Sequence, residues 1–153
     1  MNLSKKNPSF HFLIPDPNKI VSGGNIYNRF LIEALQKLGI NATQINVFPD
    51  NGISKNEYII VDTLFLEQVI PQLNEYKKKG HKNTFLLVHH LESLYPPNSF
   101  SNYQYFEKFE RRKLEKFDAF LVTSFFTKKY LQQNKMHQPI AVSYTHLTLP
   151  TKA

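Results

Sequence analysis

The sequence predicts an α/β domain of the Rossmann-like, three-layer type, with a parallel sheet between two layers of helices. Short apolar segments alternate along the chain with longer segments whose apolar residues recur every three or four positions. Several apolar segments are nearly continuous, as is typical of parallel strands that are buried on both faces. Polar residues directly follow some of these segments, and in a parallel sheet such residues gather at one edge.

The first strand and the first helix flank a loop that contains prolines and glycines. Residues 10–14 form an apolar strand, and Pro15 and Pro17 prevent the following loop from becoming helical. The sequence Ser-Gly-Gly-Asn at 22–25 then opens a helix with one apolar stripe, and Gly39 ends that helix as a C-terminal cap.

The remaining elements continue the alternation of strands and helices. We expect strands at 42–48, 58–61, 85–88, 119–122 and from 139 onward. We expect helices at 66–79, at 102–116 and from the cap at 123–124 to residue 133. Pro71 should interrupt the second helix near its start, and Gly80 should end it. Ser101 has capping-box spacing with Gln104 at the start of the third helix. The last strand is cut short, so the sheet should be incomplete at its C-terminus.

Composition limits the class of protein. With 153 residues, 41% of them hydrophobic, the chain can bury one core but hardly two. The lack of cysteine excludes a disulfide framework and a thiolate metal site, and it fits a reducing, cytoplasmic location. Residues 1–9 lack the apolar stretch of a signal peptide, and no apolar run is long enough to span a bilayer. The net charge of +7 suits an anionic partner such as a nucleic acid, an acidic lipid or a phosphorylated substrate.

The glycine pair that opens the first helix is a candidate ligand site. Gly23 and Gly24 would let a ligand approach the backbone, and the free N–H groups of the helix start favour anions or hydroxyl groups. The alternative is a tight turn that only packs the helix on its strand. No G-x-G-x-x-G spacing can be drawn through this loop, which argues against a nicotinamide dinucleotide.

Polar residues also follow two later strands. His89 and His90 come directly after 85–88, where a histidine could donate to a substrate hydroxyl or phosphate; otherwise one caps the strand and one faces solvent. Neither histidine has the neighbouring ligands that a metal site requires. Thr123 and Ser124 follow the next strand and are first of all a helix cap, which can still leave N–H groups for a ligand.

Two basic clusters account for part of the positive charge. The lysines at 77–79 end a helix, where cations complement its dipole. The basic residues at 111–113 should lie on a solvated face beside Glu107, Glu110 and Glu115. A role of these clusters in peripheral membrane contact stays open. We expect no nucleic-acid partner, because the aromatic residues are not interleaved with the basic ones.

The order of these motifs resembles the N-terminal domain of GT-B-type retaining glycosyltransferases, a group of two-domain enzymes that includes sucrose- and mannosyl-transferring members. The resemblance covers residues 10–141, and its carriers are the Pro-Asp-Pro loop at 15–17, the glycine motif at 22–25, the helix end at 34–39, Leu-Val-His-His at 87–90 and Leu-Val-Thr-Ser at 121–124.

The resemblance implies a role for each candidate residue. Gly23, Gly24 and Asn25 would lie at the interdomain cleft near the donor phosphates and the acceptor. His89 would reach the transferred sugar, and His90 stands where an acidic residue is commoner. Thr123 and Ser124 match the strand-end serine that starts the next helix. The implied partners are a nucleotide-sugar donor and a sugar or lipid-linked acceptor, with no metal and no cofactor.

The resemblance also predicts how the chain is organised. Residues 1–141 would be the acceptor-side domain, and the donor-binding domain with its paired glutamates has no counterpart, so the fragment should be inactive alone. Residues 142–153 resemble one reading frame of a sequencing adapter, and we expect a non-native tail there. Two other interpretations remain: a stand-alone Rossmann-like module that binds a nucleotide or phosphate, and a non-catalytic interaction domain that uses its basic face.

Overall fold

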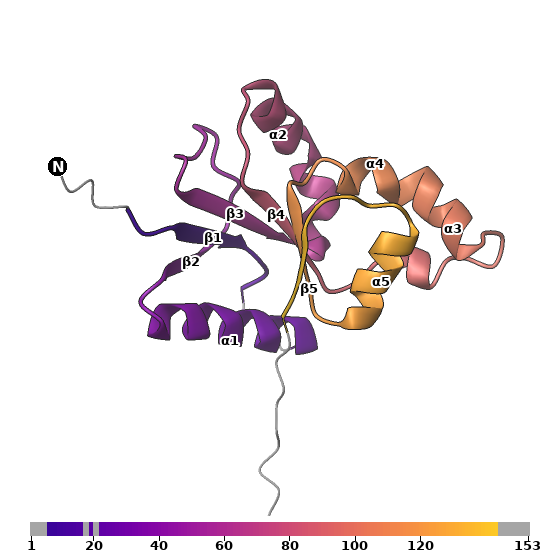
Figure 1. Ribbon diagram of the computed structural model, residues 1–153, viewed down its shortest axis with the longest axis horizontal. Helices are drawn as coiled ribbons and strands as arrows, with labels where there is room; N and C mark the ends of the chain where they lie inside the picture. The colour runs from indigo at the N-terminus through magenta and orange to yellow at the C-terminus, as the bar shows by residue number, and fades with distance from the viewer. Residues whose placement is uncertain (1–5, 17–18, 20–21, 144–153) are drawn as a thin grey trace, which may run out of the picture.

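Six parallel strands form one sheet in the order β2-β1-β3-β4-β5-β6, and helices cover both faces of this sheet (Figure 1). The computed structural model describes residues 6–16, 19 and 22–143. The strands are β1 (Ser9–Leu13), β2 (Asn41–Ile45), β3 (Glu57–Asp62), β4 (Thr84–Val88), β5 (Ala119–Val122) and β6 (Ile140–Val142). The helices are α1 (Gly23–Lys37), η1 (Thr63–Phe65), α2 (Leu66–Lys78), η2 (Glu92–Leu94), α3 (Asn102–Tyr105), η3 (Phe106–Glu110), α4 (Arg111–Leu114) and α5 (Phe125–Gln133). The predicted three-layer α/β architecture is confirmed.

Two hydrophobic clusters form the core, one between the sheet and the helices on each of its faces. On one face, α1 packs through Tyr27 against strand residues that include Phe12 and Ile60. On the other face, α2, the α3–η3–α4 helix and α5 pack against strand residues that include Ile59 and Val61. Ile60 lies between Ile59 and Val61 in β3, and its side chain belongs to the opposite cluster because successive strand residues point to opposite faces.

The chain reverses its direction of winding between β1 and β3. From β1 it passes through α1 to β2 on one side, and from β3 it passes through α2 to β4 on the other side. The two helices therefore leave neighbouring strands toward opposite faces of the sheet, as seen in Figure 1. In open parallel sheets, this switch point leaves a crevice beyond the carboxyl ends of the strands.

Glycines end the first two long helices, as predicted. Gly39 and Gly80 have φ angles of +75° and +76°, a conformation that suits glycine. Their N–H groups donate to carbonyls of the last helical turns, on Gln36 at 2.9 Å and Lys77 at 3.0 Å. Each glycine therefore satisfies a carbonyl that the helix itself leaves unpaired.

Two predicted boundaries were wrong. The strand expected at 42–48 ends at Ile45, because Phe48 turns into the core and packs edge-on against Tyr76 at 4.6 Å. Pro71 does not interrupt the second helix, which continues through it from Leu66 to Lys78. Pro71 is exposed, so water can reach the carbonyl that its missing N–H leaves without a partner.

The helix expected at 102–116 contains a π-helical segment, η3, between α3 and α4. Its last residue, Glu110, was predicted to lie on a solvated face, and this prediction was wrong. Glu110 is only 6% exposed, because it follows Phe106 and precedes Leu114 at intervals of four on the buried side of the helix.

The last strand extends beyond the predicted domain boundary at 141. Val142 pairs with Val122, and the N–H of Ser143 donates to the carbonyl of Val122 at 2.8 Å. The first two residues of the segment predicted to be non-native thus continue the sheet through backbone groups, and residues 144–153 lie outside the described part of the chain. Within the described residues, no helix combines the length and the apolar character that a membrane span requires.

Candidate functional site

The candidate site lies at the carboxyl ends of β1, β3 and β4, beside the switch point of the sheet. These strands are neighbours in the order β1-β3-β4, and all of them are parallel. The residues that follow them therefore meet at one edge, together with the start of α1. His89 comes directly after β4, and Asp62 is the last residue of β3.

The start of α1 presents backbone donors at this edge. Ser22 caps the helix, and its hydroxyl oxygen accepts a hydrogen bond from the N–H of Asn25 at 3.2 Å. The N–H groups of Gly23 and Gly24 have no hydrogen-bond partner among the described residues. They are the first donors of a 15-residue helix, so they favour an anion or a hydroxyl oxygen.

Gly24 lies against the ring of His89. A Cβ atom built on Gly24 would be 3.6 Å from the ring carbons of His89 and 3.8 Å from its Nδ1. A Cβ atom built on Gly23 would contact nothing within 4 Å, so this residue borders open space. The structure therefore brings together two of the predicted site features, the glycine pair and the first histidine.

The ring of His89 is held by a buried polar pair, Asn28 and Asp62, that is not among the predicted site residues. Its Nε2 lies 2.7 Å from Oδ1 of Asn28, and Nδ2 of Asn28 donates to Oδ2 of Asp62 at 2.9 Å. Asn28 and Asp62 are 0% and 1% exposed. Since the Asn28 amide donates to the carboxylate, its oxygen accepts from Nε2–H, and Nδ1 of a neutral His89 is left as an acceptor beside Gly24.

Burial keeps the imidazole of His89 neutral. The pKa of His89 is lowered from its ordinary value of 6.5, chiefly because burial removes the ring from water, while the charge of Asp62 opposes this effect. Nε2 lies 3.7 Å from Oδ2 of Asp62, with Asn28 between the two groups. Tyr27 packs its ring edge-on against His89 at 5.2 Å and completes the enclosure. A neutral ring in a fixed tautomer can accept a proton or a hydrogen bond at Nδ1.

His90 points away from this cluster. Its exposed ring stacks on Tyr95 with centroids 6.1 Å apart, and His90 borders a cavity whose lining does not include His89. The backbone N–H groups of His89 and His90 both lie near Oγ1 of Thr63, at 3.3 and 3.4 Å. The backbone N–H groups of the two histidines thus have the same neighbour, Thr63, but their side chains lie in different environments.

The other predicted site residues lie at the same edge with mainly structural contacts. Asn25 is 2% exposed, so its side chain lies in the interior. Ser124 caps α5 and accepts from the N–H of Thr127 at 3.2 Å, which confirms the capping role. Thr123 is half-buried, and the described contacts of Thr123 and Ser124 do not include His89.

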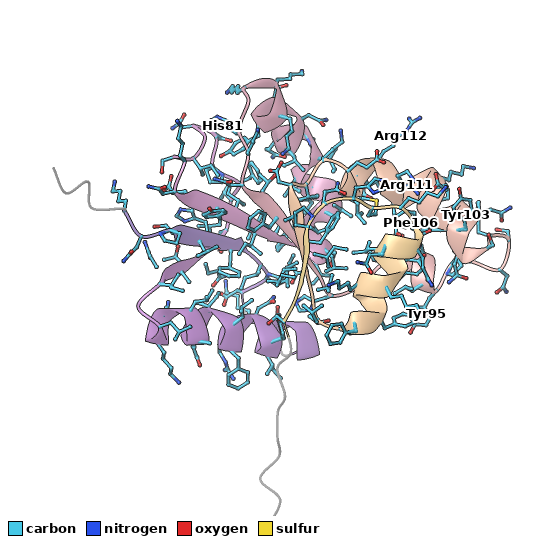
Figure 2. All side chains as sticks on the ribbon, viewed as in Figure 1. His81, Tyr95, Tyr103, Phe106, Arg111 and Arg112 are labelled. Carbon is cyan, nitrogen blue, oxygen red and sulfur yellow. The ribbon has the colours of Figure 1, made fainter. Side chains whose placement is uncertain are left out.

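The basic clusters are partly used inside the fold. Arg111 pairs with Glu107, donates to the carbonyl of Asn134 at 2.6 Å and lies 5.2 Å from the ring of Phe106. Figure 2 shows Arg111 over the helix near Phe106, whereas Arg112 extends away from it. In the other cluster, Lys77 bonds to Asp118 at 2.6 Å.

Asp62 and Asn28 carried weak sequence signals. Asp62 ends an apolar strand in the same way that His89 follows one, and Asn28 stands one helical turn after Gly24. In residues 6–16, 19 and 22–143, no group of three or more His, Cys, Asp or Glu side chains could hold a metal ion. No protein-family model matches this sequence, and no curated protein matches it significantly.

Proposed function

We propose that this chain is the acceptor-side domain of a retaining glycosyltransferase that moves a sugar from a nucleotide donor to an acceptor. The observation that carries the proposal is the position of His89 beside Gly24, within van der Waals reach of a Cβ atom placed there, with its ring oriented by Asn28 and Asp62. It lies at the switch point of a parallel sheet, where ligands of such folds bind.

The arrangement suits sugar transfer because it combines two kinds of polar group. The N–H groups of Gly23 and Gly24 would hold a phosphate or hydroxyl oxygen. Nδ1 of His89 would accept a hydrogen bond from a hydroxyl of the transferred sugar and so fix the position of its anomeric carbon. Positioned dipoles of this kind stabilise charge that develops as the diphosphate leaves.

The direct test uses the product of the uninterrupted gene. It should release a nucleoside diphosphate from one member of a panel of nucleotide sugars when an acceptor extract is added. NMR of the product should show the same anomeric configuration as the donor. Hydrolysis or transfer with inversion would contradict the retaining mechanism, and a natural stop codon near Ala141 would contradict the two-domain enzyme.

The free N–H groups of Gly23 and Gly24 also favour a second candidate, a stand-alone module that binds a nucleotide or phosphate. The two candidates differ in what the chain does alone. A stand-alone module should bind a nucleoside diphosphate with micromolar affinity by titration calorimetry, whereas an acceptor-side domain should bind it much more weakly without the donor-binding domain.

A further inference from the structure

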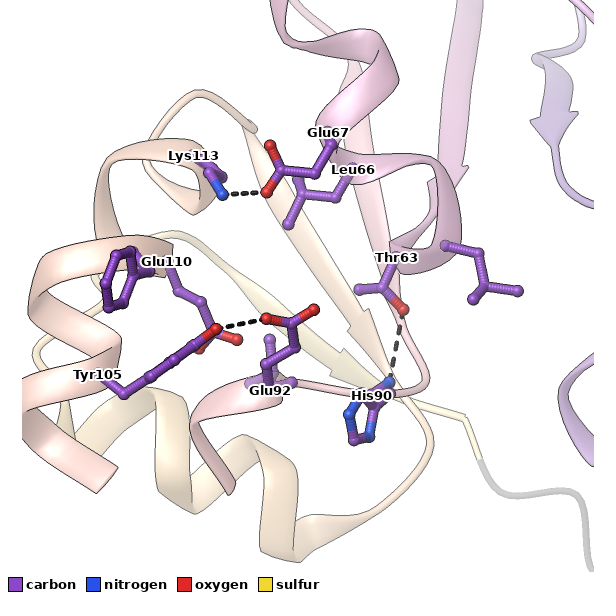
Figure 3. A pocket seen from close by; sticks show the side chains of 11 residues that line it. Thr63, Leu66, Glu67, His90, Glu92, Tyr105, Glu110 and Lys113 are labelled. Atoms are coloured by element: carbon purple, nitrogen blue, oxygen red, sulfur yellow. Dashed lines mark hydrogen bonds and ion pairs between the residues drawn. The ribbon is translucent and has the colours of Figure 1, made fainter. Parts of the chain in front are cut away.

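A cavity of about 420 Å³ lies between η1 and α2 on one side and the α3–η3–α4 helix on the other (Figure 3). Its polar lining includes Glu67, Glu92, Glu110 and Lys113, and rings of Tyr105 and Phe109 form an aromatic part of the wall. A water molecule occupies about 30 Å³ of liquid, so the cavity has room for a small organic molecule.

Glu110 is the unusual group in this cavity. It is 6% exposed, and its Oε1 accepts a hydrogen bond from the N–H of Ser93 at 3.1 Å. Its Oε2 is buried and has no hydrogen-bond partner in the described part of the chain. A buried carboxylate oxygen without a partner is costly, so a group that donates a hydrogen bond to it would be stabilising.

The other charged groups of the cavity do not compensate Glu110. Lys113 pairs with Glu67, and Glu92 accepts a hydrogen bond from the hydroxyl of Tyr105 at 2.6 Å. The hydrogen bond to Glu92 is the main cause that raises the pKa of Tyr105 to about 12, and burial and the charges of Glu92, Glu110 and Glu67 add to it. The cavity is therefore a local acidic region in a chain of net charge +7.

The helix geometry also marks this position. Glu110 is the last residue of the π-helical segment η3, and such segments are frequent at functional sites. The rings of Tyr105 and Phe109, one on α3 and one on η3, lie 4.7 Å apart. The same short stretch of helix thus supplies a carboxylate and an adjacent aromatic pair.

We propose that this cavity binds a small organic cation, whose ammonium group donates to Oε2 of Glu110 while its apolar part lies against Tyr105 and Phe109. A neutral hydroxyl could satisfy the hydrogen bond, but it would leave the buried charge of Glu110 uncompensated. An ammonium group donates the hydrogen bond and also compensates the negative charge, and it is attracted to aromatic ring faces. The proposed site does not use His89 or the glycine pair, so it is independent of the proposed glycosyl transfer.

Titration calorimetry of the present chain with benzylammonium tests the proposal, and benzyl alcohol is the neutral probe of similar shape. Benzylammonium should bind saturably at one site, and benzyl alcohol should not bind measurably. Glu110→Gln should weaken the binding of benzylammonium about tenfold or more, because it removes the charge of the acceptor. Glu115→Gln removes the same charge from an exposed position on the next turn and should leave the affinity unchanged.

Several results would overturn the proposal. Equal binding of the alcohol would mean an apolar or hydroxyl site, and equal binding by Glu110→Gln would place the cation elsewhere. A lack of saturable binding would mean that the cavity holds water only. If Glu110→Gln does not fold, Lys113→Met decides: it removes a positive charge from the cavity wall, so a cation should bind more tightly, and an affinity equal to that of the unchanged chain would overturn the proposal.

Discussion

His89 has one ring nitrogen engaged in the fold and one beside the glycine pair. Nε2 is bound to the buried amide of Asn28, which is itself held by Asp62. Nδ1 lies next to Gly24 and has no hydrogen-bond partner among the described residues. The chain thus fixes the ring while leaving its acceptor available, which is the property that a substrate-positioning histidine needs.

The lowered pKa of His89 makes stability depend on pH. Above about pH 6.5 the group is neutral in both states; as the pH falls below that value, the unfolded chain takes up the proton first, so the free energy of unfolding decreases. Urea unfolding at about pH 7 and pH 5.5 should show this loss of stability, and His89→Gln should reduce it. An identical pH dependence in His89→Gln and the unchanged chain would contradict the assignment, and exposed His137→Gln is the matched control.

Asn28 is a positioning residue, and its removal should affect both of its partners. Asn28→Ala leaves Asp62 and the ring of His89 without their shared amide, so we expect a loss of about 1 to 3 kcal/mol in the free energy of unfolding. Asn51→Ala, in an exposed turn, should change it by less than about 0.5 kcal/mol. NMR should also show that the Nε2–H of His89 loses its protection from exchange; unchanged protection would contradict the bond.

At the scale of elements, a substitution at the start of α1 should affect ligand binding without affecting the stability of the domain. Gly24→Val should abolish transfer in the complete protein, because the branched side chain would extend past the ring of His89 into the space of the ligand. The domain should still fold within about 1 kcal/mol of its original stability, since a Cβ atom fits there without a clash. Circular dichroism and nucleoside diphosphate release measure the two effects.

Gly23→Ala is the control for this substitution, because its Cβ atom would meet nothing within 4 Å. It also replaces a glycine in the first turn of α1, and its methyl group does not approach His89. Wild-type turnover in a folded Gly24→Val variant would show that no substrate binds at the start of α1. Equal losses in both variants would mean that the helix start, and not the contact with His89, determines activity.

The sequence predicted the strands and helices well because their patterns are local. The apolar runs of β3 and β4 and the stripe of α1 identify these elements without reference to the rest of the chain. The pairing of Asn28 with Asp62 joins residues 34 positions apart, so no local pattern could reveal it. The prediction that Glu110 faces solvent was wrong because it relied on the charge of the residue. The position of Glu110 four residues from both Phe106 and Leu114 puts it on the buried stripe of the helix.

At the scale of the whole molecule, the boundary between domain and tail can be located by truncation. Deleting residues 144–153 should shift the thermal midpoint by less than about 2 °C, because we predict that this segment did not evolve with the core. Deleting residues 142–153 should lower the midpoint further, since it removes the pairing of Val142 with Val122 and the hydrogen bond from Ser143. Calorimetric scans measure both, and a large effect of the shorter deletion would contradict the adapter interpretation.

The sheet also explains why one domain can present two separate sites. The winding reversal between β1 and β3 places α1 on one face and α2 on the other. His89 lies against α1, while the next residue, His90, borders the cavity beside η1 and α2. One strand end therefore contributes to a candidate transfer site on one side and to the proposed cation site on the other.

The most direct test of the central claim compares the turnover of three histidine variants in the proposed two-domain enzyme. His89→Ala should lower kcat about a hundredfold or more, because it removes the proposed hydrogen bond to the transferred sugar. The exposed His137→Ala should retain full turnover, and His90→Ala should lose less than His89→Ala. If a folded His89→Ala variant keeps its turnover, or if His90→Ala proves the more damaging substitution, the assignment of His89 to sugar transfer is wrong.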